Sequence, residues 1–280
     1  MFYLLKSFIQ MKILINNNDL NEALYGISDL GFVPTMGSLH KGHVSLIKRS
    51  LKECKKTIVS IFINPTQFNN KKDFKKYPKN QNKDLAILRK LEVDFVFIPQ
   101  KKHVYNFIRK KTIKINKKDK IMCARFRKGH FEGVIDVMDR LTRMINPKKI
   151  FMGEKDFQQL YLVKNHIEKK FSSKVVPCKT IRNQNQVALS SRNLHLNKND
   201  LIKMGKIVKN IMSIKTKLKN QKNIKRYLVQ MKKDLNILYK IKIEYFELRN
   251  IKNFNTTNNL YNARLFIAYH LNKIRLIDNF

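Results

Sequence analysis

Short apolar runs alternate with helical patterns over the first two thirds of this chain. Five runs rich in β-branched and aromatic residues predict buried strands, at 57–63, 93–98, 112–115, 149–152 and 174–178. Apolar residues that recur every three or four positions predict helices between them, at 85–91, 134–145 and 160–167. This alternation predicts an α/β domain in which helices cover both faces of a parallel sheet.

A different pattern begins near Ile181. Helical spacing continues at 201–211 and 224–238, and three strand-like runs then follow at 240–248, 264–270 and 273–277. Helices followed by adjacent strands predict a smaller α+β domain with an antiparallel sheet. We therefore expect one domain over residues 1–180 and a second over residues 181–280. Residues 1–10 form a candidate extension, because Met11 is an alternative start.

The segment from Pro34 to His43 contains the pattern His-x-Gly-His at a predicted strand-to-helix turn. Phe32 and Val33 precede it, and apolar residues at helical spacing follow from Val44. Such a turn offers unpaired backbone N–H groups and the positive end of a helix dipole. Two imidazoles add further donors. The turn therefore suits an anion, and a nucleoside triphosphate is the ligand that we expect.

The net charge of +39 arises from 59 Lys and Arg against 20 Asp and Glu. Such a balance is typical of proteins that bind nucleic acid. However, the lysines are spread along the whole chain together with many Asn and Ile, as drift toward A/T-rich codons would produce. We therefore favour drift and expect no specific nucleic acid partner. Five of the eight glycines gather in three short segments, as Gly37, Gly42, Gly129, Gly133 and Gly153.

Cysteine usage and hydropathy restrict the compartment. Cys54, Cys123 and Cys178 are widely spaced, so the sequence predicts neither a disulfide framework nor a zinc site. No apolar run reaches the length of a membrane span, and the first ten residues lack a signal-peptide cleavage site. We expect a cytoplasmic protein that does not associate with membranes.

Four polar segments lie near predicted strand ends or the domain junction, at 64–68, 127–134, 153–159 and 188–193. Each suits substrate or phosphate binding, and each also has a purely structural interpretation. The alternatives are an Asn-Pro turn, a solvated basic turn, a helix N-cap at Asp156 beside a Glu154–Lys155 surface pair, and a Ser-rich loop. Taken singly, these segments do not decide between binding and structure.

Together the segments are more specific. The ordered series PTMGSLHKGH, SIFINPTQF, RKGHFEGV, GEKDFQQL, ALSSRN and RLIDN resembles that of the pantothenate synthetases, or pantoate–β-alanine ligases. Order and spacing match from about Met11 to Asn279. The resemblance implies a Rossmann-like nucleotidyltransferase domain, a smaller C-terminal lid and a homodimer. It also implies that pantoate attacks the α-phosphate of Mg²⁺-ATP to give pantoyl-adenylate and pyrophosphate, after which β-alanine attacks the acyl carbon to give pantothenate and AMP.

The matching motifs imply residue roles. His40, His43 and Lys155 are the expected catalytic residues, with His43 as proton donor, while Gln67 and Gln159 are expected to bind pantoate. The residues expected to bind ATP are Met36, Gly37, Ser38, Leu39, His40, Lys41, Gly42, His43, Gly153, Glu154, Lys155, Asp156, Ile181, Leu189, Ser190, Ser191 and Arg192. Within this set, Gly153 and Asp156 would bind ribose and Ile181 adenine through its backbone. No residue is expected to be a dedicated metal ligand.

The sequence departs from the family pattern at three places. Lys79 replaces an arginine, Lys83-Asp84 replaces an acidic pair near the expected Mg²⁺, and a glycine that is common in the segment 123–126 is absent. Other interpretations stay open at this point. They are a different adenylate-forming nucleotidyltransferase, an aminoacyl-tRNA synthetase, and a basic nucleic-acid-binding protein. The synthetase is disfavoured because no Lys-rich Met-Ser-Lys loop or anticodon-binding domain is apparent.

Overall fold

The computed structural model describes residues 10–68, 74–75, 77–106 and 113–280. Its contacts divide the chain into two compact units. The first unit holds residues up to 114 together with 129–153 and 159–178, and the second holds 115–128, 154–158 and 179–280. The second unit therefore includes two segments that precede the predicted boundary at residue 181.

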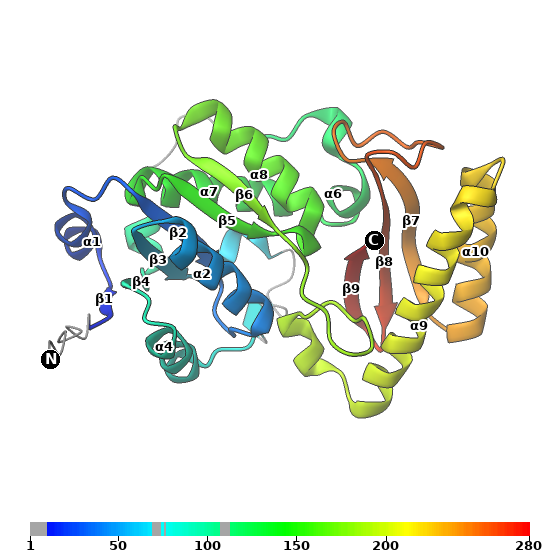
Figure 1. Ribbon diagram of the computed structural model, residues 1–280, viewed down its shortest axis with the longest axis horizontal. Helices are drawn as coiled ribbons and strands as arrows, with labels where there is room; N and C mark the ends of the chain where they lie inside the picture. The colour runs from blue at the N-terminus through cyan, green and yellow to red at the C-terminus, as the bar shows by residue number, and fades with distance from the viewer. Residues whose placement is uncertain (1–9, 69–73, 76, 107–112) are drawn as a thin grey trace, which may run out of the picture. The chain divides into compact units, whose positions relative to one another are not determined.

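A six-stranded parallel sheet forms the centre of the first unit (Figure 1). Its strands, in spatial order, are β1 (Lys12–Leu14), β4 (Phe95–Phe97), β3 (Lys56–Ile61), β2 (Leu30–Thr35), β5 (Lys149–Gly153) and β6 (Lys174–Cys178). The predicted parallel α/β fold is thus confirmed. The strand predicted at 112–115 is wrong for residues 113–115, which form no strand; Thr112 lies outside the described residues. Ile115 supplies apolar character there, but no neighbouring strand pairs with it.

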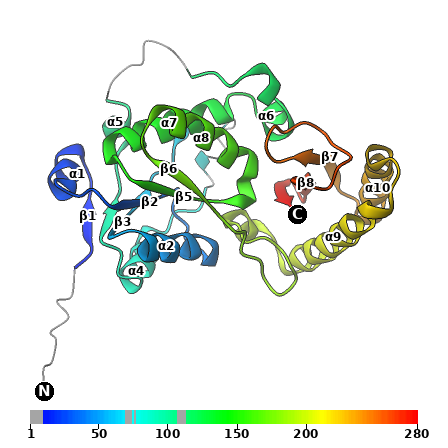
Figure 2. The ribbon, with the colours of Figure 1, turned by 45° about the horizontal axis from the view of Figure 1, so that its top comes forward.

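Helices cover both faces of this sheet. They are α1 (Asn17–Leu24), α2 (Lys41–Glu53), α4 (Gln81–Lys90), α5 (Lys101–Val104), α7 (His130–Ile145) and α8 (Phe157–Lys170). Ile47 of α2 and Leu88 of α4 pack on Val33, Val59 and Val96 of the central strands. Figures 1 and 2 show α7 and α8 on the opposite face. Successive side chains of a strand point to opposite faces, and β2, β3 and β4 are buried almost continuously, so both faces are covered.

The order of the strands selects the edge where a ligand can bind. From β2 the chain proceeds to β3 and β4 on one side, whereas β5 pairs with the other side of β2. In open α/β sheets, ligands bind beyond the carboxyl ends of the strands at such a point of reversal. Thr35 and Gly153 end these two neighbouring strands.

The second unit contains an antiparallel sheet of β7 (Lys242–Asn250), β8 (Ala263–Leu271) and β9 (Ile274–Asn279). Two long helices, α9 (Lys198–Lys217) and α10 (Ile224–Tyr239), pack on it. Ile207 and Ile211 of α9 and Leu228 of α10 share one core with Ile267 of β8. The predicted α+β architecture is therefore confirmed. The short helix α6 (Met122–Phe126) was not predicted.

Among the described residues, no helix has both the length and the apolar character required to cross a membrane.

Candidate functional site

The turn after β2 is held by acceptors from elsewhere in the first unit. Gly37, at φ +77°, donates its N–H to Oγ1 of Thr35 at 3.1 Å. The carboxylate of Asp84 on α4 accepts the N–H of Ser38 at 2.8 Å and the N–H of Leu39 at 2.7 Å. Asp84 is only 2% exposed, so these bonds are shielded from water. The turn therefore depends on a residue that lies 45 positions beyond Leu39.

The two histidines of the turn cap the start of α2 and are linked by a hydrogen bond. Nδ1 of His40 accepts the N–H of Gly42 at 3.1 Å, and Nδ1 of His43 accepts the N–H of His40 at 3.3 Å. Their ring centroids are 4.1 Å apart. Because a neutral imidazole has one donor and one acceptor nitrogen, this network assigns the proton of each ring to Nε2. The turn thus carries two adjacent Nε2–H donors.

The expectation that this turn offers unpaired backbone N–H groups is wrong for residues 37–40 and 42. Each of these N–H groups donates to an acceptor within the first unit. The physical reason is the close supply of acceptors, namely the Thr35 hydroxyl, the Asp84 carboxylate and the two imidazoles. An anion at this turn would therefore be met by side-chain groups, above all the imidazoles.

The predicted pantoate-binding residue Gln67 lies beside the nucleotide motif. It ends the 3₁₀ turn η1 (Pro65–Gln67) after β3 and is 9% exposed. Its Nε2 contacts Sδ of Met36, the first residue of the predicted ATP-binding set. The structure therefore brings one residue predicted for each substrate into contact.

Two residues of the segment 127–134, His130 and Gly133, have a different use from the two that the sequence indicated. His130 is 6% exposed, and its Nδ1 lies 2.6 Å from the backbone oxygen of Gln67. A Cβ atom added at Gly133 would lie only 2.4 Å from the backbone oxygen of Thr66. Thus His130 and Gly133 brace the turn that carries Gln67, and neither phosphate binding nor a solvated turn describes His130.

In the second unit, Glu154, Lys155 and Asp156 form the short turn η3 that continues from β5. Nζ of Lys155 lies 3.8 Å from Oδ2 of Asp156, while Glu154 pairs with Arg264 at 2.9 Å. The suggested Glu154–Lys155 surface pair is therefore wrong. The side chain of Lys155 is 16% exposed, so its charge is partly desolvated.

The last strand braces this turn. Nδ2 of Asn279 donates to the backbone oxygens of Glu154 at 2.9 Å and Lys155 at 3.0 Å. Asp278 next to it accepts two bonds of 2.8 Å from the guanidinium of Arg182. Burial raises the pKa of Asp278, and Arg182 opposes that shift. The sequence singled out the RLIDN segment but assigned it no role, because side-chain bonds to backbone oxygens leave no signature in a single sequence.

The loop from Ile181 to Arg192 brings several predicted residues together. The backbone oxygen of Ile181 accepts the N–H of Leu189 at 3.0 Å, and Oγ of Ser190 accepts the N–H of Arg192 at 3.3 Å. Ser191 is 8% exposed. Burial, together with the charge of Arg192, lowers the pKa of Arg127 to about 10. Positive charge is thus concentrated here without full solvation, which favours an anionic ligand.

Two adjacent glutamines have separate environments. Gln158 is buried in the second unit, where its amide bonds to the N–H of Cys123 and to the backbone oxygens of Asp119 and Ile121. Gln159 belongs to the first unit and is half-buried. Gln158 therefore joins segments of the second unit, whereas Gln159, the residue predicted to bind pantoate, does not take part in those bonds.

Comparison with known proteins decides the family. The model of the family described as pantoate–β-alanine ligase matches residues 11–280. The pantothenate synthetase of Helicobacter acinonychis (strain Sheeba) is 37% identical over 279 residues, which cover 96% of this chain and 99% of that protein. The chain belongs to the pantoate–β-alanine ligase family.

Solved structures agree. The ligase from Thermus thermophilus superposes with a TM-score of 0.89 at 28% identity, covering 96% of this chain and 98% of that one. The ligase from Francisella tularensis, solved as a complex with β,γ-ATP and β-alanine, superposes with a TM-score of 0.81 at 34% identity, covering 96% and 97%. The chain is thus an enzyme, and the alternatives left open by its sequence are not favoured.

Two of the residues at which this ligase departs from its family pattern make side-chain contacts. Nζ of Lys79 lies 5.7 Å from the centroid of the Phe74 ring, a cation–π contact. Sγ of Cys123 lies 3.1 Å from the Tyr245 hydroxyl and 3.3 Å from Nη2 of Arg275. All three cysteines of the ligase are buried and remain thiols.

The placement of the carboxylates shows how the ligase could hold Mg²⁺. Among the described residues, no group of three or more His, Cys, Asp or Glu side chains is placed to hold a metal ion. Both oxygens of Asp84 already accept backbone N–H groups. The described residues therefore do not form a complete set of Mg²⁺ ligands. Such a site suits an ion that is bound mainly through substrate phosphates and water.

Proposed function

We propose that this ligase condenses pantoate with β-alanine in two steps, through pantoyl-adenylate, and releases pyrophosphate and AMP. The observation that carries the proposal is the imidazole pair of His40 and His43, whose Nδ1 atoms are both occupied as acceptors. Two fixed Nε2–H donors can bind a triphosphate and the charge that develops on its α-phosphate. In this assignment His43 also donates a proton.

Lys155 supplies a positive charge to the same phosphates. Its backbone is held by Asn279, so the base of a long side chain is fixed before the ligand binds. Ser190, Ser191 and Arg192 complete the phosphate-binding set, and the lowered pKa of Arg127 supports an anion near them. Positioning and charge are sufficient for attack at phosphorus, so the reaction needs no covalent intermediate on the enzyme.

Gln67 and Gln159 bind pantoate in this proposal. Amides can meet both the hydroxyls and the carboxylate of pantoate without adding a second charge to the site. The contact of Gln67 with Met36 supports this role, because the carboxylate of pantoate must lie next to the nucleotide to attack it. Gly153, Asp156 and the backbone of Ile181 bind the nucleoside.

Mg²⁺ enters as the partner of ATP, where it reduces the charge repulsion among the phosphates. We also propose that the ligase acts as a homodimer in the cytoplasm, without specific binding to nucleic acid or membranes. The three buried thiols support a reducing compartment. Light scattering of the purified protein would test the dimer.

A product assay tests the reaction. Purified enzyme with ATP, Mg²⁺, pantoate and β-alanine should give pantothenate, AMP and pyrophosphate in equal amounts. When β-alanine is omitted, pantoyl-adenylate should accumulate on the enzyme. Formation of ADP and phosphate would contradict adenylate chemistry.

A further inference from the structure

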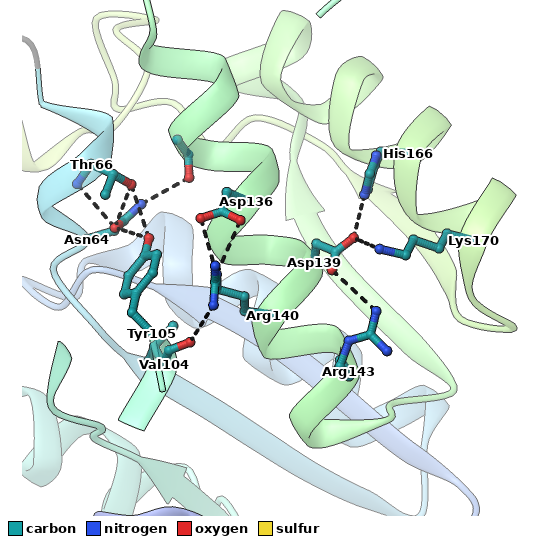
Figure 3. A network of polar contacts seen from close by, with 11 residues as sticks. Asn64, Thr66, Val104, Tyr105, Asp136, Asp139, Arg140, Arg143, His166 and Lys170 are labelled. Carbon is teal, nitrogen blue, oxygen red and sulfur yellow. Dashed lines mark hydrogen bonds and ion pairs between the residues drawn. The ribbon is translucent and has the colours of Figure 1, made fainter. Parts of the chain in front are cut away.

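A series of polar contacts leads from α7 through Tyr105 to Asn64 (Figure 3). Asn64 in turn contacts Gln67. Nε of Arg140 lies 3.2 Å from both carboxylate oxygens of Asp136, and Nη1 donates to the backbone oxygen of Val104 at 3.4 Å. The guanidinium carbon lies 4.6 Å from the centroid of the Tyr105 ring. Because Arg140 is only 4% exposed, the aromatic ring rests on a buried and well-bonded support.

The hydroxyl of Tyr105 meets the side-chain oxygen of Asn64. The O–H donates to Oδ1 at 2.7 Å, the shortest of three bonds to this oxygen; the hydroxyl and the backbone N–H of Thr66 donate to it at 3.0 Å and 3.3 Å. Asn64 is 1% exposed, so water cannot easily replace a lost partner. Burial raises the pKa of the Tyr105 phenol, so the hydroxyl keeps its proton at neutral pH.

The opposite side of the Asn64 amide faces acceptors. Nδ2 lies 3.1 Å from the backbone oxygen of Gly133 and 3.4 Å from Oε1 of Gln67. A flipped Asn64 amide would place its oxygen against both of these acceptors. With Oε1 of Gln67 turned toward Asn64, its Nε2 faces Met36. The orientation of one amide therefore determines the orientation of the next.

We propose that Tyr105 is a positioning residue for pantoate: its hydroxyl fixes the amide of Asn64, which in turn makes Gln67 present Nε2 to the substrate. Arg140 supports Tyr105 from behind. The inference rests on the proposed role of Gln67 as a pantoate-binding residue. It adds a contribution from two residues, Tyr105 and Arg140, that do not touch the substrate.

The test compares Tyr105→Phe with the wild type and with Tyr25→Phe. Phenylalanine keeps the ring on Arg140 and removes only the hydroxyl, while Tyr25 is 91% exposed and serves as a matched loss of a phenol. We expect KM for pantoate to rise roughly tenfold in Tyr105→Phe, the effect of one lost buried hydrogen bond. KM for ATP should stay close to the wild type in Tyr105→Phe, and the thermal midpoint should fall only by what one lost buried hydrogen bond costs. Tyr25→Phe should leave both KM values and the thermal midpoint close to the wild type.

A double-mutant cycle separates this inference from the proposed role of Gln67. In Gln67→Ala the substrate contact is already absent, so adding Tyr105→Phe should leave KM for pantoate unchanged. Multiplicative effects in the double variant, or equal rises in KM for pantoate and ATP, would overturn the inference. So would an unchanged KM for pantoate in Tyr105→Phe when Gln67→Ala raises it, and then the role of Gln67 would stand. If Gln67→Ala itself has no effect on pantoate, both proposals fall.

Discussion

Oδ1 of Asp84 accepts the backbone N–H of Leu39 at 2.7 Å, although Asp84 lies 45 positions further along the chain. Its other oxygen accepts the N–H of Ser38. The family resemblance drew attention to this aspartate because Lys83-Asp84 replaces an acidic pair that is expected near Mg²⁺. In the structure Asp84 has a structural role instead, because its carboxylate holds the turn that carries His40 and His43.

Substitution of Asp84 should therefore damage both stability and turnover. Asp84→Asn keeps one acceptor but places an amide N–H₂ against the second backbone N–H. We expect the free energy of unfolding to fall by about 1–3 kcal/mol and kcat to fall with it. Urea unfolding and steady-state kinetics measure the two effects. Asp234→Asn on the exposed part of α10 is the matched control, and an equal response of both variants would contradict the role of Asp84.

Removal of the proposed phosphate donors should affect turnover far more than folding. His43→Ala and Lys155→Ala each remove a donor directed at the reacting phosphate, and loss of one such donor costs about 3 kcal/mol, or roughly a hundredfold in kcat. Single-turnover formation of pantoyl-adenylate is the direct measurement. Lys174→Ala, an exposed lysine in β6, should leave the rate unchanged. Folded variants with near-normal rates would show that the site is wrongly assigned.

The neighbouring glutamines allow a sharp comparison. Gln159→Ala should weaken pantoate binding by about 1–3 kcal/mol while ATP binding and stability stay close to the wild type. Gln158→Ala should instead lower stability and leave pantoate binding close to the wild type, because it removes bonds to Cys123, Asp119 and Ile121. Calorimetry with each substrate and thermal unfolding separate the two results. Equal losses for ATP and pantoate in Gln159→Ala would contradict its assignment.

The close approach of α7 to η1 predicts a steric effect. A methyl group at Gly133 would press against the backbone oxygen of Thr66, so Gly133→Ala should lower the free energy of unfolding by about 1–3 kcal/mol. It should also raise KM for pantoate, because Gln67 follows Thr66. Gly153→Ala meets open space and should unfold like the wild type. A neutral result for Gly133→Ala in urea unfolding would show that the turn can move aside freely.

Acid stability should depend on Glu244. Burial acts to raise the pKa of its carboxyl, but hydrogen bonds from Arg275 and His270 outweigh burial and hold it below the ordinary value. A depressed pKa in the folded state means that the ionised form stabilises the protein above the unfolded pKa of about 4.3. That stabilisation is lost as the pH falls through the folded value. Glu244→Gln should therefore lose less stability than the wild type between about pH 5 and pH 3, measured by urea unfolding.

The sequence was sufficient to predict the strands and helices whose apolar residues recur at a regular spacing. The strand predicted at 174–178 coincides with β6, and the helix predicted from residue 224 begins there as α10. Both bury apolar residues that the pattern identified, Val175 and Cys178 in β6 and Ile224, Leu228 and Leu235 in α10, so local pattern and tertiary packing agree. The run 112–115 failed because its apolar residues carry no information about the pairing partner that a strand requires.

The sequence motifs supplied the residues of the proposed site but did not reveal which groups hold them in place. The motifs located His40, His43 and Gln67, whose residue types signal their chemistry. The residues that hold them could not be found in the same way. Asp84 and Asn279 act through hydrogen bonds to backbone groups far away in the chain, and a single sequence does not reveal which distant backbone a side chain will meet.

In the proposed anion site the donors of the β2 turn are imidazoles, since its backbone N–H groups at residues 37–40 and 42 are already engaged. An anion site made of main-chain groups survives almost any change of side chain, whereas the proposed site depends on the codons of two individual residues. One nucleotide change in either codon suffices to delete a donor. The same imidazoles also accept the N–H groups of Gly42 and His40, so such a change removes a cap of α2 together with the donor.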